Sequence, residues 1–433
     1  MVAKFSIGSS YRAARFSAVA LAGFVTASLL FVAAPLHADD TVLWNVASGD
    51  WSNPGNWLDV YNANVTPSAN DLAYINNGGI ATITQAGAVC DYLTVDFNSA
   101  VEMTGGALTA FGEFVGQYYD SAGNFTQAGG INNITASLIL GDYDGASGTY
   151  NLSGGLLLGN IVHGSGSAVF NFSGGTLQAN GSYNLNNVPM TLGTSGGGAT
   201  FNTAGYAVPL SASLSGPGGL TLNDSLGTGS LIFAASNTYT GGTTIRSGVL
   251  IAGASNSLSP KSSVTVNGGT LDASGFANTV ASLNVASSGC LTIGVGNTLT
   301  SNGAVVLNGA TNVMISGASN GQPALAAGSA SLAGSLSVTL GNGYLPTSGD
   351  PFTALSAGSL TGTFNGGGRL VQALSSSSGS SLGQFNVAYT KNMVSLVYQP
   401  LLMLASLSDD VYQSTRGFGA YRYATCFSDP STG

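Results

Sequence analysis

The sequence has 433 residues, of which only 6% are charged and 44% are hydrophobic, and it contains 64 glycines. Hydrophobic residues spread in short runs argue against a disordered chain, while the abundance of Gly, Ser, Thr and Asn disfavours helices. The formal net charge of −9 argues against nucleic acid or an anionic membrane as a partner. We therefore expect an all-β protein.

Residues 1–38 have the pattern of a secretory signal peptide. Lys4, Arg12 and Arg15 precede an uncharged apolar stretch at 16–34, and Ala38 is the expected last residue before cleavage. Removing these three cations changes the net charge from −9 to −12. An uncleaved membrane anchor is the alternative. We expect an exported mature chain, secreted or associated with the outer membrane at the cell surface, that does not itself span a membrane.

Residues 39–97 form a tryptophan-rich segment. Trp44, Trp51 and Trp57 are the only tryptophans of the chain and are separated by turn-forming residues. Exposed tryptophans could stack on sugar rings, but the end of a repeat array also needs bulky residues to cover its core. We favour the second interpretation and predict an N-terminal β cap.

Residues 98–345 contain a loosely repeated strand-and-turn unit. Segments at 123–131, 148–156, 168–176 and 199–205 alternate apolar and polar residues and then reach small residues, with aromatic residues at 125, 150, 170 and 201. Such a unit recurring at this spacing is typical of a solenoid. We predict a right-handed parallel β-helix of about 11 coils, in which the four aromatic side chains form a ladder in the core.

A more specific pattern lies at 226–253. It runs from an apolar strand through Asn237, Tyr239 and a Gly-Gly pair to Ile245, Gly248 and Leu250. This pattern resembles the autotransporter-associated β-strand repeat, also called the passenger-associated transport repeat. The resemblance implies one more coil of a β-solenoid in an exported, passenger-like protein of the cell surface, with a structural or adhesin-like role.

The C-terminal part departs from the repeat. Residues 346–400 predict antiparallel hairpins that form a C-terminal β cap, and residues 401–433 form a non-repeat tail. Proteins of the resembled family have a C-terminal outer-membrane barrel, whereas the residues after Pro400 are fewer than even about 8 strands require. Self-transport is therefore not implied, and a truncated autotransporter passenger is one alternative.

The search for chemistry finds one weak candidate. Asp142 and Asp144 would share one side of a strand, and Asp120 lies about one coil earlier. These carboxylates could belong to a polysaccharide lyase or hydrolase, but no Lys or Arg lies between Arg15 and Arg246. The same three could hold calcium weakly, although solvated turn residues are the favoured interpretation.

Other reactive residues are sparse. His163 is the only histidine of the mature chain and is expected in a loop. Cys90, Cys290 and Cys426 are widely spaced, so isolated thiols are favoured over one bridged pair. We predict no catalytic, cofactor-binding or metal-binding residues, and partners among surface glycans or other envelope proteins.

Overall fold

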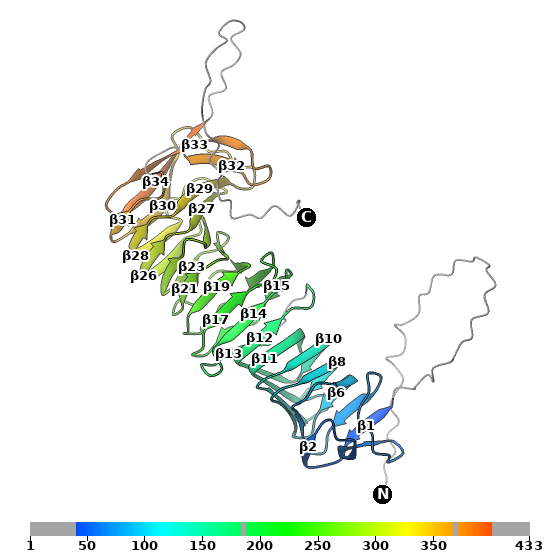
Figure 1. Ribbon diagram of the computed structural model, residues 1–433. Helices are drawn as coiled ribbons and strands as arrows, with labels where there is room; N and C mark the ends of the chain where they lie inside the picture. The colour runs from blue at the N-terminus through cyan, green and yellow to red at the C-terminus, as the bar shows by residue number, and fades with distance from the viewer. Residues whose placement is uncertain (1–39, 183–187, 367–370, 401–433) are drawn as a thin grey trace, which may run out of the picture. The chain divides into compact units, whose positions relative to one another are not determined.

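The computed structural model describes residues 40–182, 188–366 and 371–400. These residues belong to one compact unit and form an all-β fold in which strands stack along one axis (Figure 1). The described residues contain no α-helix, and their single helical turn is the 3-10 helix η1 (Pro54–Asn56). The predicted fold class is confirmed as an all-β parallel solenoid. The predicted signal peptide at 1–38, the tail at 401–433 and Cys426 lie outside the described residues.

Each coil visits three faces in a constant order, and each face is a parallel ladder between successive coils. The first face contains the starts of β6 (Ala88–Val95), β8 (Ala107–Val115) and β10 (Ile131–Leu140), the middle of β11 (Ser147–His163), the end of β12 (Ser167–Gln178), β14 (Ala199–Asn202), β17 (Leu220–Asn223), β19 (Thr243–Ser247), β21 (Ser263–Val266), β24 (Ser282–Val285), the ends of β26 (Leu299–Leu307) and β28 (Leu325–Leu332), and β31 (Leu360–Gly362).

The second face contains β1 (Thr41–Trp44), β4 (Leu72–Ile75) and the ends of β6, β8, β10 and β11. Beyond residues 183–187, the same place in the coil is taken by β15 (Ala207–Leu210), β18 (Ser230–Phe233), β20 (Val249–Ala252), β22 (Thr270–Ala273), β25 (Cys290–Gly294), β27 (Ala310–Ile315), β29 (Ser335–Leu340) and β32 (Val371–Ser375).

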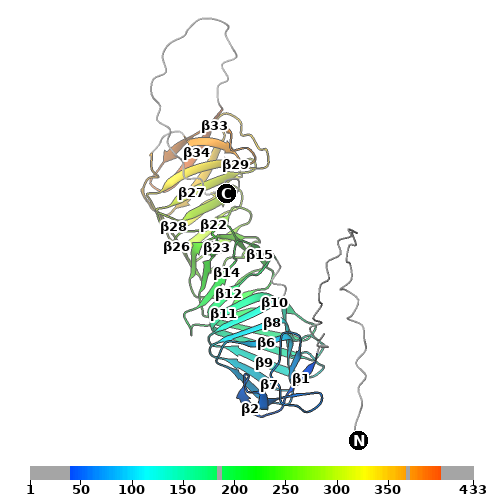
Figure 2. The same ribbon diagram turned by 45° about the vertical axis from the view of Figure 1, so that its right-hand side comes forward.

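The third face contains β2 (Ser48–Asp50), β5 (Ile80–Ile83), β7 (Ser99–Met103), β9 (Ala122–Gln127), the starts of β11 and β12, β13 (Met190–Leu192) and β16 (Leu214–Ser215). It resumes with β23 (Asn278–Val280), the starts of β26 and β28, and β30 (Pro351–Ala357). Figure 2 shows the same stack turned by 45°. Each strand inside a ladder thus bonds to the coil before it and the coil after it.

Inward and outward residues alternate along the strands, and the inward ones fill the stack. Phe125, Tyr150 and Phe170 are fully buried and lie in register on the third face. Their ring centroids are 4.8 and 5.4 Å apart, and their planes are nearly parallel, at 12° and 4°. The predicted aromatic ladder is confirmed for these three residues.

Phe201 is a correction to that prediction. Met190 follows Phe170 on the third face, whereas Phe201 lies opposite Leu177 on the first face. The ring of Phe201 meets Phe172 at 5.3 Å and 64°, so it packs edge-on instead of extending the parallel stack. After Phe170 the chain completes a whole coil and then passes one corner further, which places Phe201 on another face.

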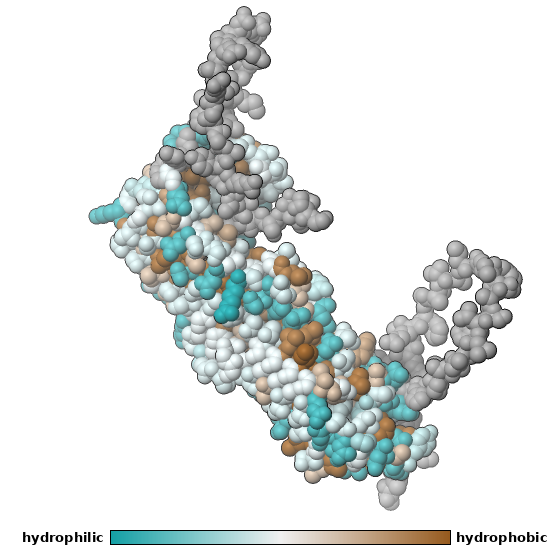
Figure 3. Space-filling model, in the orientation of Figure 1, coloured by the Kyte–Doolittle hydropathy of each residue, from teal (hydrophilic) through white to brown (hydrophobic). Residues whose placement is uncertain are grey.

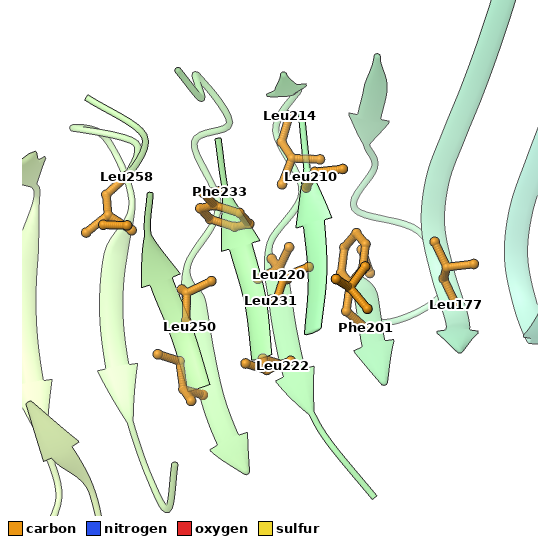
Figure 4. Close-up of a cluster of buried hydrophobic side chains, with 14 of the residues drawn as sticks. Leu177, Phe201, Leu210, Leu214, Leu220, Leu222, Leu231, Phe233, Leu250 and Leu258 are labelled. Atoms are coloured by element: carbon orange, nitrogen blue, oxygen red, sulfur yellow. The ribbon is translucent and has the colours of Figure 1, made fainter. Parts of the chain in front are cut away.

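Aliphatic side chains continue the core beyond this point. Leu231 and Leu250 are register partners one coil apart, and Figure 4 shows them among the leucines and phenylalanines that fill the space between the strands. Burying this apolar surface is the main favourable term for folding, at roughly 25 cal/mol per Å².

Antiparallel strands lie at both ends of the stack. At the first end, β3 (Trp57–Asp59) pairs with β1, and Trp57 packs edge-on against Trp44 and Trp51 at 4.9 and 4.8 Å. At the other end, β33 (Ser381–Tyr389) and β34 (Met393–Pro400) pair antiparallel with each other and with β32 and β30. These pairings interrupt the parallel order that would otherwise continue outward.

The cysteines differ from the expectation of isolated thiols. Cys90 is a buried free thiol in β6. Cys290, at the start of β25, is disulfide-bonded, which corrects the expectation for this residue. Spacing along the sequence does not show which residues the coils bring together, and this is why a bridged pair was not the favoured alternative.

Replacing Phe170 by Asp tests the assignment of the inward face. We expect Phe170→Asp to abolish cooperative unfolding, because it places an unpaired charge in the core. The matched control is Val169→Asp, since Val169 precedes Phe170 in β12 and points outward. Thermal unfolding followed by circular dichroism measures both; a Phe170→Asp variant that melts like the wild type would show that the inward face is assigned wrongly.

Candidate functional site

The three aspartates singled out from the sequence lie at one corner of the stack, between the second and third faces. Asp120 is in the turn at 116–121, and Asp142 and Asp144 are in the turn at 141–146. The backbone N–H of Asp142 donates to the carbonyl of Gly116 at 2.8 Å, so the second turn lies directly on the first. The Asp120 carboxylate lies against Gly145 of the upper turn. Asp120 and Asp144 are exposed, and Asp142 is half-buried.

A fourth carboxylate, Asp96, lies one coil below and was not anticipated. Its Oδ1 accepts hydrogen bonds from the backbone N–H of Gln117 at 2.7 Å and from the hydroxyl of Ser121 at 2.5 Å. Burial raises the pKa of Asp96 although these hydrogen bonds lower it, and the charge of Asp142 raises it further. Burial also raises the pKa of Asp142. Asp96 therefore ties one coil to the next.

The carboxylate corner has no basic side chain from its own half of the chain. No Lys or Arg occurs from residue 16 to residue 245, so this half supplies no cation to stabilise the negative charge that develops in elimination from an acidic polysaccharide. Within the described ranges, no group of three or more His, Cys, Asp or Glu side chains is arranged to hold a metal ion. The exposed carboxylates Asp120 and Asp144 can accept hydrogen bonds from hydroxyl or amino groups of a ligand.

The same corner carries exposed aromatic side chains, which we call the aromatic corner: Phe97, Tyr118, Tyr119 and Tyr143. The rings of Phe97 and Tyr118 lie 6.1 Å apart at 20°, and those of Tyr119 and Tyr143 lie 5.2 Å apart at 26°. Each pair joins successive coils. The signal in the sequence was an aromatic residue in each turn, 20 to 25 positions apart, but it lay outside the strands on which the repeat was recognised.

The tryptophans and His163 are weaker candidates for a functional site than this corner. Trp44, Trp51 and Trp57 are buried, and the Nε1–H of Trp57 donates to the carbonyl of Trp51 at 2.9 Å. Their rings therefore present no open surface on which a sugar could stack. His163 is the last residue of β11 instead of a loop residue.

A buried polar network lies inside the stack, and it too was not anticipated. Glu113 is fully buried, and its Oε2 accepts a hydrogen bond from Asn132 Nδ2 at 3.1 Å. Asn132 Nδ2 is also 3.2 Å from the hydroxyl of Tyr150, which donates to Gln127 Oε1 at 2.7 Å. Burial raises the pKa of Glu113 to about 8, and the Asn132 hydrogen bond offsets this only in part. Glu113 is thus a neutral acid at neutral pH.

The segment that carries Asn237 takes the place of a strand on the third face. Residues 237–239 are not a strand, yet the backbone N–H of Thr238 still donates to the carbonyl of Leu214 at 2.8 Å. The Asn237 side chain is buried and completes the ladder in both directions: its Oδ1 accepts from the N–H of Leu214 at 2.7 Å, and its Nδ2 donates to the carbonyl of Ser257 at 2.5 Å. One amide thereby joins three coils.

Local contacts also explain the other residues of this motif. The buried hydroxyl of Tyr239 lies 2.6 Å from Thr243 Oγ1, which lies 2.8 Å from Ser262 Oγ on the next coil. A side chain on Gly241 would meet the backbone of Gly218 at 2.3 Å, so the coils approach too closely for any other residue. Asn278, two coils after Asn237, accepts in the same way from the N–H of Leu258 at 2.8 Å.

Asn237→Ala tests this side-chain ladder. It leaves the N–H of Leu214 and the carbonyl of Ser257 buried without a partner, so we expect a loss of about 2 to 4 kcal/mol in the free energy of unfolding. Asn267→Ala, at an exposed position on the next coil, is the control and should change little. Urea denaturation measures both, and equal midpoints for the two variants would contradict the ladder.

Glu113 predicts a pH dependence of stability. Its folded pKa of about 8 lies above the ordinary 4.5, so the protonated form is favoured by folding. The stabilisation is complete below pH 4.5 and is lost as the pH rises through about 8, by an amount on the order of 5 kcal/mol. Burial also raises the pKa values of neighbouring Cys90 and Tyr150, well above their ordinary ranges, so neither group ionises in this interval.

We therefore expect the wild type to be less stable at pH 8.5 than at pH 5.5, and Glu113→Gln to remove most of this difference. Glu102→Gln changes an exposed carboxylate of β7 and is the matched control. Urea midpoints at the two pH values measure the effect. A Glu113→Gln variant with the same pH dependence as the wild type would assign the effect to other groups.

Comparison with known proteins identifies the Asn237 segment. Residues 226–252 match the passenger-associated-transport-repeat family. No curated protein and no solved structure matched the chain. Among the described residues, no helix has the length and hydrophobicity needed to cross a membrane. The resemblance drawn from Asn237, Tyr239 and the Gly-Gly pair is thus confirmed: the chain contains a passenger-associated transport repeat, built as little more than one coil of a parallel β-solenoid.

Proposed function

We propose that the chain is an exported solenoid, secreted or held at the cell surface, with a structural and adhesive role and without catalysis. The observation that carries this proposal is the passenger-associated transport repeat at 226–252, whose Asn237 joins it to the coils before and after. A repeat of this kind within one continuous stack fits the passenger part of an exported protein. Its partners, in this proposal, are surface glycans or other envelope proteins.

The surface of the stack supports an adhesive role. Only 6% of the residues are charged, and the outward faces are rich in Ser, Thr, Asn and Gly. Figure 3 shows a surface that is mostly pale, with separate teal and brown patches. Long faces of this kind provide many weak contact points, and such contacts add up when several engage one extended partner.

A polysaccharide-active enzyme is the second candidate, and one observation favours it. Asp120, Asp142 and Asp144 lie on stacked turns at one corner, as a pair of catalytic carboxylates would require. The absence of any Lys or Arg from 16 to 245 weighs against it. The triple variant Asp120→Asn, Asp142→Asn, Asp144→Asn separates the two candidates, because it removes acid–base chemistry and leaves the faces of the stack unchanged.

The test has two measurements on the purified full chain. We expect it to be retained on intact cell envelopes, and the Phe170→Asp variant to lose retention because its faces are no longer formed. We also expect no polysaccharide cleavage, measured as release of reducing ends or unsaturated products. Failure of the wild type to bind any envelope would contradict the adhesive role. Cleavage that the triple variant abolishes would establish the enzyme instead.

A further inference from the structure

We propose that the aromatic corner binds a linear polysaccharide whose sugars are neutral or carry free amino groups, laid along the axis of the stack. The proposal rests on the adhesive function proposed above and deepens it by naming the site and the ligand class. It uses the rings of Phe97, Tyr118, Tyr119 and Tyr143 and the carboxylates of Asp120 and Asp144.

The rings form a strip along the axis. Phe97, Tyr118 with Tyr119, and Tyr143 lie in the turns of three successive coils, and the two ring pairs connect these coils at 6.1 and 5.2 Å. Tyr118 also hydrogen-bonds Tyr74 of β4, and burial together with Tyr74 raises the pKa of Tyr118 to about 12. Strands repeat at about 4.8 Å from coil to coil, which is comparable to the length of one sugar unit. A linear glycan along the axis therefore passes aromatic rings on three successive coils.

Folding alone does not explain these residues. Tyr119 is 66% exposed and Phe97 is 48% exposed, so their rings contribute little to the core. Phe97 also has a φ of 53°, a left-handed conformation that is unfavourable for a bulky residue. Its ring packs on one exposed neighbour, Tyr118, at 6.1 Å, and strained residues are concentrated at functional sites. An aromatic ring at position 97 is therefore better explained by a ligand than by stability.

Charge selects the kind of ligand. Asp120 and Asp144 are exposed in the same turns as Tyr119 and Tyr143, Asp142 is half-buried in the upper turn, and no Lys or Arg occurs from 16 to 245. Acidic glycans would be repelled by this corner, whereas hydroxyl and ammonium groups can donate to the carboxylates. Sugar C–H faces pack on aromatic rings, and ammonium groups are attracted to ring faces as well. A neutral or amine-bearing glycan can therefore contact both the carboxylates and the aromatic rings of the corner.

Isothermal titration calorimetry of the full chain tests the proposal with three probes: a hexamer of β-1,4-linked glucosamine, cellohexaose and a hexamer of galacturonic acid. We expect the glucosamine hexamer to bind most tightly and to weaken with salt, cellohexaose to bind more weakly and without salt dependence, and the acidic hexamer not to bind. Equal affinity for the acidic hexamer, or no binding of any hexamer, would overturn the proposal.

Ring variants connect the binding to the corner. Tyr119→Ala with Tyr143→Ala should weaken binding of the glucosamine hexamer about tenfold or more. Tyr206→Ala and Phe276→Ala are matched controls, since these rings are 39% and 43% exposed and belong to no aromatic pair in the described part of the chain. Both should bind like the wild type, and unchanged urea midpoints should show that all variants fold. Unchanged affinity in the double variant would overturn the site.

Phe97→Asn separates a binding role from a structural one. Asn tolerates the left-handed conformation better than Phe, so this variant should unfold at the same or a higher temperature while its affinity for the hexamer falls. A variant that loses stability and keeps its affinity would assign Phe97 to the fold. The two proposals can also fail separately: retention on envelopes that survives the ring variants leaves the adhesive function standing and removes this site, whereas no retention at all removes the function.

Discussion

The parallel backbone ladder between coils is the constraint on which the rest of the structure depends. Every strand inside a ladder uses its N–H and C=O groups on the coils before and after it, so each coil must repeat the path of its neighbour. This requirement explains the composition. Inward positions alternate with outward ones, and corners need glycine where coils nearly touch. The high glycine content of the sequence follows from this geometry.

Where the ladder lacks a strand, side chains maintain it. Asn237 takes the place of a strand on the third face and bonds to backbone groups of the coils before and after it, and Asn278 at the start of β23 accepts from the N–H of Leu258 on the strandless coil before it. The matched family repeat therefore continues the hydrogen bonding between coils across a position of the third face that has no strand. Glu113 shows the opposite situation, because it is a polar group that the stack encloses without a cation, and it is accommodated as a neutral acid in a network with Asn132 and Tyr150.

Much of the fold could be predicted from the sequence, because alternation and spacing encode the ladder directly. Phe125, Tyr150 and Phe170 were placed correctly since they recur at one coil length. Phe201 was misplaced because its spacing does not show how many corners the chain has turned. Glu113 was missed because β8 spans two faces with a register shift, which hides its inward direction. The aromatic corner was missed because it lies in turns, where strand periodicity carries no information, and the bond of Cys290 depends on contacts that spacing does not reveal.

The stack offers few charged side chains, since only 6% of the residues of the chain are charged. The aromatic corner is where exposed rings, backbone strain and carboxylates coincide. Hydrogen–deuterium exchange of the full chain, with and without the glucosamine hexamer, tests this account most directly. Added protection confined to the turns at 96–98, 116–121 and 141–146 is the predicted result. Protection elsewhere, or none under conditions where the hexamer binds, would contradict it.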